Sequence, residues 1–265
     1  RLLLPPGFEP TSPAAGRTRV LLMHDGQNLW DPGAIGGGWE VDAALNGDSA
    51  WDDVIVVAVD NAADRLHVYG HVADDPFGDG SSFGGEAGAY LGLLTDEVLP
   101  FVRARYGLVA AGDSLAMAGS SMGGLVTLEA ARQWNGELAC AAALSPTLGW
   151  GAFRATASGA DAMVNLWPTT PGHGSAAIFL YSGGAEGNGC VDIDGDGVDE
   201  DSEDSDNYCV TVQFRDALES LGYVFETDLW HWWEPLAQHN EAAWAAQVGR
   251  MLTACSDSGW IAADP

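Results

Sequence analysis

Residues 115–134 read LAMAGSSMGGLVTLEAARQW, and this stretch decides the fold. Its first four residues form a short apolar run typical of a buried strand, and the apolar residues after position 124 recur with helical spacing. Between them, GSSMG fits the G-x-S-x-G pattern, in which a strained strand-to-helix turn presents a serine beside a helix N-terminus. An ordinary Gly/Ser turn can also match in a chain with 35 glycines. The strand and helix on either side favour Ser121 as a nucleophile.

Apolar runs and helical patterns alternate along the rest of the chain. This alternation predicts a mostly parallel α/β sheet with helices on both faces, and we expect one domain over residues 1–265. Pro100 should kink or restart the helix around it. The expected strands are 19–24, 53–60, 115–118, 139–145, 176–182 and 223–229, and the expected helices are 86–106, 122–134, 210–221 and 240–254.

The composition is strongly acidic. The formal charge is −28, from 38 acidic residues and only 10 basic ones, all of them arginine. Nucleic acid and anionic membranes bind cationic surfaces, so both are excluded as partners. The chain has no apolar run near the ~20 residues of a membrane helix, and it starts at Arg1 without an initiator methionine, which favours a trimmed, soluble protein. High salt, calcium-rich surroundings and GC-rich coding would each account for the acidity.

Four cysteines form an even set without any C-x-x-C spacing, which disfavours zinc and thioredoxin-like chemistry. Cys190 and Cys209 bracket one acidic loop and suggest a local disulfide, which leaves Cys140 to pair with Cys255 by elimination. Such bridges imply an oxidising compartment, so we expect a secreted protein, extracellular or periplasmic in a bacterium. Four buried thiols are the alternative.

Several segments together carry a family resemblance that spans most of the chain. They are HDGQNLWDP at 24–32, WEVD at 39–42, Asp60-Asn61 with Arg65 and Tyr69, AGSSMGG at 118–124 and QHNEAAW at 238–244. With these segments the chain resembles the esterase family of α/β-hydrolases that includes feruloyl and acetylxylan esterases of carbohydrate esterase family 1, enterochelin esterases and esterase D. The resemblance implies an α/β-hydrolase fold and a serine esterase.

The remaining catalytic residues follow from chain order, which in this fold is nucleophile, acid, histidine. His239 lies after the last expected strand and in the family's histidine motif, whereas its competitor His231 lies between tryptophans without that match. YSGGAEG at 181–187 resembles the family's strand-Gly-x-x-acid pattern and places the acid at Glu186. Asp192 and Asp228 are alternatives, and Glu186 could simply belong to the acidic loop beside it.

The oxyanion hole and the substrate pocket are expected around Ser121. One amide should come from Met122, directly after the nucleophile, and the other from Gly26 or Gln27, in the loop after the expected strand 19–24. His24 is interpreted as a structural histidine at the strand end. Tryptophans either wall a pocket for a sugar or aryl group or simply pack the core; the pocket candidates are Trp30, Trp230, Trp232 and Trp233, with Trp39 and Trp150 near the same face.

The acidic stretch 192–203 has the EF-hand calcium pattern, with oxygen donors at loop positions 1, 3, 5, 7, 9 and 12 and glycine at position 6. Position 8 is Asp199 instead of an aliphatic residue, and no helix obviously precedes the loop. It therefore resembles an isolated calcium loop of the dockerin or thrombospondin-repeat kind, inserted at 189–209; a disordered acidic tract is the alternative. The predicted structural Ca²⁺ ligands are Asp192, Asp194, Asp196, Val198, Glu200 and Glu203.

Together these patterns predict a secreted serine esterase that forms an acyl-enzyme at Ser121 and acts on acyl or feruloyl esters of carbohydrates, including polysaccharide-linked ones, or on small aryl esters. Catalysis itself needs no cofactor. Acyl transfer to another alcohol would use the same residues. A non-catalytic, calcium-dependent binding module on a hydrolase scaffold is the alternative from another class. The oligomeric state is not predicted.

Overall fold

The computed structural model describes residues 1–10, 18–31, 37–134, 136–153, 159–169, 174, 176–184, 189–200 and 206–262. A seven-stranded sheet runs through its centre, with the order β1-β3-β2-β6-β7-β8-β9. Only β1 is antiparallel to its neighbour, and all other pairs are parallel, as the alternation predicts. The strands are β1 (Leu2–Leu3), β2 (Arg19–Met23), β3 (Val54–Ala58), β6 (Gly112–Ser120), β7 (Leu138–Leu144), β8 (Ala177–Gly183) and β9 (Leu229–Glu234).

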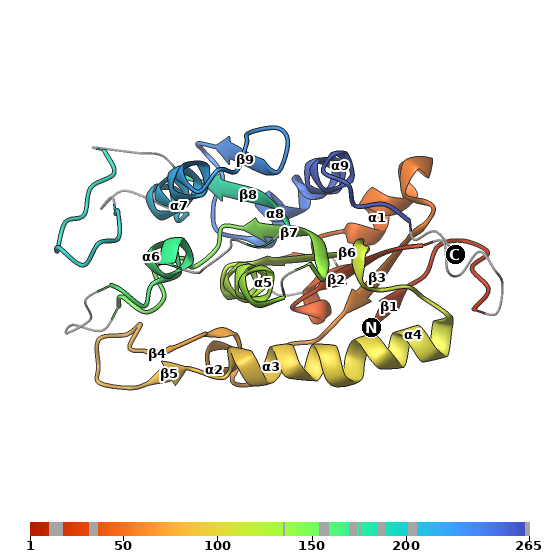
Figure 1. Ribbon diagram of the computed structural model, residues 1–265, viewed down its shortest axis with the longest axis horizontal. Coiled ribbons are helices and arrows are strands. Elements are labelled where there is room, and N and C mark those ends of the chain that lie inside the picture. The colour runs from red at the N-terminus through yellow and green to blue at the C-terminus, as the bar shows by residue number, and fades with distance from the viewer. Residues whose placement is uncertain are drawn as a thin grey trace.

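Helices cover both faces of the sheet because its central strands are buried on both sides. Alternate residues of β2 pack into two separate cores: Val20 and Leu22 contact the helices between β3 and β9, while Leu21 and Met23 contact the first and last helices. Figure 1 shows α3 and α4 as one long helix on one side and α1 with α9 on the other. The α-helices are α1 (Val41–Asn46), α2 (Arg65–Tyr69), α3 (Ala87–Leu93), α4 (Leu99–Tyr106), α5 (Met122–Gln133), α6 (Met163–Leu166), α7 (Tyr208–Ser220), α8 (Glu241–Ala245) and α9 (Val248–Asp257).

The long helix restarts at Pro100, as the sequence predicts. A π-helical turn, η4 (Leu94–Val98), joins α3 to α4, and Pro100 is the second residue of α4. Proline has no N–H and its ring collides with the carbonyl four residues earlier, so a widened turn lets the helix continue past it. The short 3₁₀ turns are η2 (Gly26–Asn28), η3 (Ser49–Trp51) and η5 (Trp167–Thr169), and β4 (Ala73–Asp74) pairs with β5 (Phe83–Gly84).

The last strand differs from the prediction. Residues 223–228 form a turn in which Glu226 has a positive φ of 58° and Asp228 accepts a hydrogen bond from the amide of Val224. The strand is β9, LWHWWE, which pairs with β8 alone at the edge of the sheet. Its three tryptophans and its histidine lack the uniform aliphatic pattern of a strand buried on both faces, so the sequence indicates a loop there.

Both predicted disulfides are present. Cys140 on β7 bonds Cys255 on α9, and Cys190 bonds Cys209 at the start of α7. The first bridge ties the final helix to a central strand. The second closes the acidic segment between the two cysteines. Within the described part of the chain, no helix is both long and apolar enough to cross a bilayer.

Candidate active site

Ser121 lies at the turn between β6 and α5, in a strained conformation with φ 56° and ψ −124°. Two glycines permit that turn. A Cβ on Gly119 would lie 2.5 Å from the backbone of Gly123, and one on Gly123 would lie 3.0 Å from an oxygen of Asp25. The geometry is that of a nucleophile elbow, with Ser121 directly before the N-terminus of a 12-residue helix.

His239 is held by a carboxylate. Its Nδ1 lies 2.5 Å from Oδ1 of Asp206, whose side chain is fully buried, whereas the imidazole remains 35% exposed. His239 comes from the loop between β9 and α8, and its ring meets Trp244 edge-on, with 5.1 Å between centroids. A carboxylate on Nδ1 leaves Nε2 as the nitrogen that can exchange a proton with a serine hydroxyl.

The other oxygen of Asp206 is also fixed. Its Oδ2 accepts hydrogen bonds from the hydroxyl of Ser145 and the amide of Gly183, each at 2.7 Å. A Cβ on Gly183 would lie 2.7 Å from that same oxygen, so glycine is what allows the carboxylate to approach the end of β8. Trp244 donates its indole N–H to the Ser145 hydroxyl at 3.0 Å, which links the histidine's aromatic neighbour to the same cluster.

Ser121 and His239 line one cavity of about 630 Å³, a volume typical of small-molecule sites. Most of the residues that line it have polar side chains. The lining residues are Asp25, Gln27, Asn28, Asp31, Trp39, Asn61, Arg65, Ser120, Ser121, His239, Glu241 and Trp244.

The acid on His239 is not the one that the sequence predicts. Glu186 lies outside the described residues, and the contact to Nδ1 is made by Asp206. Asp228 caps the turn before β9, and Asp192 belongs to the acidic loop. Asp206 keeps the expected chain order, but it lies in the residue pair before α7, behind a run of other acidic residues, and not at the end of β8. The Asp206-Asn207 pair directly before α7 is the feature of the sequence that could have indicated this acid.

Of the two candidates for the second oxyanion amide, Gly26 and Gln27, the amide of Gly26 is already used. It donates to the carbonyl of Val59 at 2.9 Å, and a Cβ at Gly26 would lie 2.8 Å from a side-chain oxygen of Asp60. Gly26 is therefore a close-approach residue, which corrects its predicted role. Gln27 lines the cavity, and its side chain accepts a hydrogen bond from the amide of Asn61 at 3.1 Å. The Met122 amide is the first of α5, where a helix offers no carbonyl partner.

The predicted aromatic pocket is also placed differently. Trp39 and Trp244, whose rings are tilted by 41° with 5.8 Å between centroids, line the cavity of Ser121. Trp230 and Trp232, on one face of β9, instead line a second cavity of about 690 Å³, where the guanidinium of Arg250 lies 4.0 Å from the Trp232 ring.

The remaining tryptophans have structural contacts. Trp233 donates to the carbonyl of Gly184 at 2.9 Å and packs on Tyr208. Trp30 is half-buried against the core beside α1, and Trp150 is buried in the other core. Because the 229–234 segment is a strand, its side chains alternate between two faces, and the three tryptophans cannot wall one pocket.

Two other histidines, His24 and His231, have a pKa lowered by burial. Burial lowers the pKa of His24 to about 4, and its Nδ1 pairs with the hydroxyl of Tyr90 at 2.7 Å. Burial likewise lowers the pKa of His231 to about 4, and its Nε2 contacts Ser182 at 2.8 Å. His24 therefore fits the structural role expected for it, and His231 lies away from the cavity of Ser121.

Below the elbow, Arg65 forms a two-point ion pair with Asp25. Its Nε and Nη2 lie 2.8 and 2.7 Å from the two carboxylate oxygens, and Nη2 also donates to the carbonyl of Ser120 at 3.2 Å. Burial would lower the pKa of Arg65, but the hydrogen bond and charge of Asp25 raise it. The pair connects the loop after β2 to the residue before the nucleophile, a contact that the sequence did not predict.

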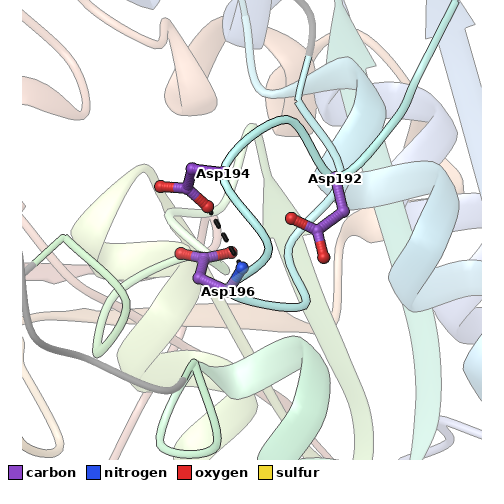
Figure 2. Close-up of side chains that lie close together, drawn as sticks. All are labelled: Asp192, Asp194 and Asp196. Atoms are coloured by element: carbon purple, nitrogen blue, oxygen red, sulfur yellow. Dashed lines mark hydrogen bonds between the residues drawn. The ribbon is translucent and has the colours of Figure 1, made fainter.

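The acidic loop brings three of its predicted ligands together. One carboxylate oxygen from each of Asp192, Asp194 and Asp196 lies within 4.8 Å of the other two, so this cluster could hold a metal ion. Figure 2 shows the three side chains on one turn of the loop. Burial, with the charges of its two neighbours, raises the pKa of Asp196. Glu200 forms an antiparallel bridge with Val191. Glu203 lies outside the described residues.

The fold and the elbow define an α/β-hydrolase of the serine hydrolase class, and comparisons with known proteins give the family. The family model Esterase, described as "Putative esterase", matches residues 1–254, so the chain belongs to that family and is a serine esterase, a carboxylic ester hydrolase. No curated protein matches the chain.

Solved structures share the fold at low identity. A siderophore hydrolase EstB from Aspergillus nidulans is 19% identical with a TM-score of 0.60, covering 95% of this chain and 87% of that one. An IroE-like serine hydrolase from Shewanella oneidensis is 18% identical with a TM-score of 0.66, covering 95% and 73%. A ferulic acid esterase is 16% identical with a TM-score of 0.61, covering 97% and 91%.

Proposed function

We propose that the protein hydrolyses acyl or feruloyl esters of carbohydrates, or small aryl esters, through a triad of Ser121, His239 and Asp206. The observation that carries this proposal is the single cavity that Ser121 shares with a histidine already held by a buried carboxylate. Membership of the esterase family makes a non-catalytic module the weaker alternative. The ferulic acid esterase among the similar folds supports the feruloyl ester as a substrate to test.

In the proposed reaction the Ser121 Oγ attacks the ester carbonyl while Nε2 of His239 takes its proton. Asp206 stabilises the resulting imidazolium through Nδ1, and the amides of Met122 and Gln27 bind the oxyanion. The tetrahedral intermediate collapses and expels the alcohol, which receives the proton from His239. Water, deprotonated by His239, then attacks the acyl-enzyme and releases the acid, which restores the Ser121 hydroxyl.

We propose a structural Ca²⁺ at the acidic loop. The donor set fits, since it consists of carboxylate oxygens that converge within 4.8 Å, and Ca²⁺ takes oxygen ligands at about 2.3–2.6 Å. Asp192, Asp194 and Asp196 would hold the ion, with the Val198 carbonyl and Glu200. The loop is also hydrogen-bonded to the rest of the fold, since the side-chain amides of Asn165 and Gln213 both donate to the carbonyl of Gly197. A bound ion would offset carboxylate repulsion in the segment that precedes Asp206.

We further propose that residues 1–265 form one α/β-hydrolase domain with an insertion at 189–209, and that it works outside the reducing cytoplasm. The two disulfides support that location, because such bonds persist in oxidising compartments.

Hydrolysis of p-nitrophenyl acetate, followed by a panel of acetyl, feruloyl and longer acyl esters, tests the function. Ser121→Ala and His239→Ala should each lower kcat by about 10³-fold or more, since triad members act as a unit. Ser120→Ala is the matched control and should do much less. A serine-directed phosphonate should block the enzyme at Ser121. Loss of activity in Ser120→Ala with retention in Ser121→Ala would refute the assigned nucleophile.

A further inference from the structure

The catalytic cavity carries an excess of negative charge. Among the described residues that line the cavity, Arg65 is the arginine. Its guanidinium is paired at contact distance with the carboxylate of Asp25, so those two charges cancel locally. Asp206 lies behind His239 and adds a further carboxylate, which contacts Nδ1 of that imidazole at 2.5 Å. Asp31 and Glu241 supply two more carboxylates on the wall.

Glu241 is the carboxylate best placed to act on a substrate. It is the first residue of α8, two positions after His239, and it is half-buried. Its Oε1 accepts a hydrogen bond from the side-chain amide of Asn28 at 3.3 Å, a neutral donor that orients the carboxylate without cancelling its charge. Its charge also reaches Arg65, since it adds to the larger effect of Asp25 in raising the pKa of that residue against the lowering effect of burial.

We infer that Glu241 determines specificity by charge: the site accepts neutral or cationic esters and disfavours anionic ones. This inference rests on the proposed function, because it concerns the same cavity. A carboxylate within several ångströms of a substrate charge, in partly screened surroundings, changes binding by about three- to tenfold. The net charge of −28 on the whole chain acts in the same direction at longer range.

The inference separates two kinds of candidate substrate. A feruloyl or acetyl ester of a neutral sugar carries no charge at the cavity and belongs to the accepted group. Its hydroxyl groups can also donate hydrogen bonds to Glu241 and to the side-chain carbonyls nearby. An ester that carries a carboxylate of its own belongs to the disfavoured group.

Three aryl acetates of similar size test the inference: 4-acetoxybenzoate, its methyl ester, and 4-acetoxyphenyltrimethylammonium. Their leaving groups differ in reactivity, but that difference cancels when the ratio of kcat/KM values is compared between enzyme variants. Glu241→Gln should raise the anionic-to-neutral ratio by about three- to tenfold and lower the cationic-to-neutral ratio by a similar factor. Raising NaCl from 10 to 300 mM should reduce both changes.

Glu219→Gln is the matched control, because it removes an equal charge from the exposed face of α7. Both ratios should stay at their wild-type values in that variant. Asp31→Asn, at an exposed lining position, should shift the ratios in the same direction as Glu241→Gln but less, which provides a second test if Glu241→Gln folds poorly. Thermal melting identifies a poorly folded variant.

The outcomes also distinguish this inference from the proposed function. If the neutral ester is hydrolysed by wild type but neither Glu241→Gln nor Asp31→Asn changes the ratios by more than twofold, the charge inference is wrong and the esterase stands. If none of the three esters nor the acyl panel is hydrolysed, the proposed function fails first.

Discussion

At the scale of single residues, the site depends on side chains that are fixed before any substrate arrives. Asp206 accepts hydrogen bonds from Ser145, Gly183 and His239, from the ends of β7 and β8 and the loop after β9. A carboxylate held by three donors keeps one orientation, so the imidazole keeps one orientation as well. Residues 112–134 supply the nucleophile, but the acid–histidine pair is assembled from segments far apart in the chain.

The first prediction concerns Asp206. Asp206→Asn should lower kcat by about 10³–10⁴-fold with a much smaller effect on KM, since the carboxylate acts on the imidazolium formed during the reaction. The substitution preserves shape, so thermal melting should confirm a folded variant. Glu186→Gln is the control and should stay within a few-fold of wild type. The opposite pattern, with Glu186→Gln inactive and Asp206→Asn active, would return the role to Glu186.

The second prediction concerns His24, a buried residue below the elbow with a pKa lowered to about 4 by burial. In the unfolded chain its pKa is near 6.5, so the unfolded state binds more protons between pH 6.5 and 4. Stability therefore falls as pH falls through this window. The loss from His24 at pH 5 is about 2 kcal/mol, relative to pH 7.5.

Urea unfolding of wild type and His24→Gln at pH 7.5 and pH 5 measures this effect. The variant should be less stable at pH 7.5, because it loses the contact with Tyr90, but its stability should depend less on pH. The comparison removes the contribution of the many carboxylates, which both proteins share. Identical pH dependence in the two proteins would mean that His24 titrates normally in the folded state.

At the scale of elements, runs buried on both faces were predictable and the edge of the sheet was not. β2 and β3 are RVLLM and VIVVA, and every residue in them is buried, so hydrophobicity alone indicates a strand. β9 has one neighbour strand and exposes about 40% of Trp232 and Trp233. Because it is not buried on both faces, its sequence is not a continuous aliphatic run. Misreading β9 as a loop also misplaced the tryptophans around His239.

The acidic segment between Cys190 and Cys209 explains why the sequence points to a different acid. The strand-Gly-x-x-acid pattern assumes that the acid follows β8 directly, whereas Asp206 lies near the far end of the segment that Cys190 and Cys209 close. Local pattern matching has no information about which of many nearby carboxylates reaches the histidine. That contact depends on how the disulfide-closed segment folds back against β7 and β8, and this is a tertiary property.

The third prediction concerns calcium binding by the acidic segment between Cys190 and Cys209. Calcium that binds only the folded state at 100 times its Kd adds about 2.7 kcal/mol, which corresponds to a rise in Tm of about 5 °C or more for a chain of this size. Chelator should remove the rise, and Asp194→Ala should abolish the response to calcium. Asp199→Asn is the control, since position 8 is not a ligand position in the pattern. Elemental analysis should find one calcium per chain.

Removing calcium with a chelator also tests whether the acidic segment affects kcat. Asp206 is anchored to Ser145 and Gly183 independently of the acidic cluster, so chelation at 25 °C should reduce kcat far less than Asp206→Asn does. A Tm that is equal in chelator and in millimolar calcium, with no bound metal, would leave the loop as a solvated acidic tract.

At the scale of the whole molecule, the charge of −28 opposes the compact state. With 38 acidic residues and 10 arginines, at least 28 carboxylates have no arginine of their own. Several arginines are already committed to close pairs, among them Arg19 with Asp53 and Arg132 with Glu129. The core and the Cys140–Cys255 bridge must therefore hold together a surface whose charges repel one another.

The last prediction is that this repulsion outweighs the ion pairs, so that sodium chloride stabilises the protein. The Debye length falls from about 30 Å at 0.01 M to well under 10 Å at 0.5 M, which screens exposed carboxylates from one another more than it weakens half-buried pairs such as Arg65 with Asp25. Tm in the presence of chelator should rise by several °C between 10 and 500 mM NaCl. Choline chloride at equal ionic strength should give a similar rise, because screening does not depend on a particular cation, whereas a rise with sodium alone would indicate a bound ion. If Tm falls with both salts, the pairs made by the ten arginines contribute more to stability than the excess carboxylates remove.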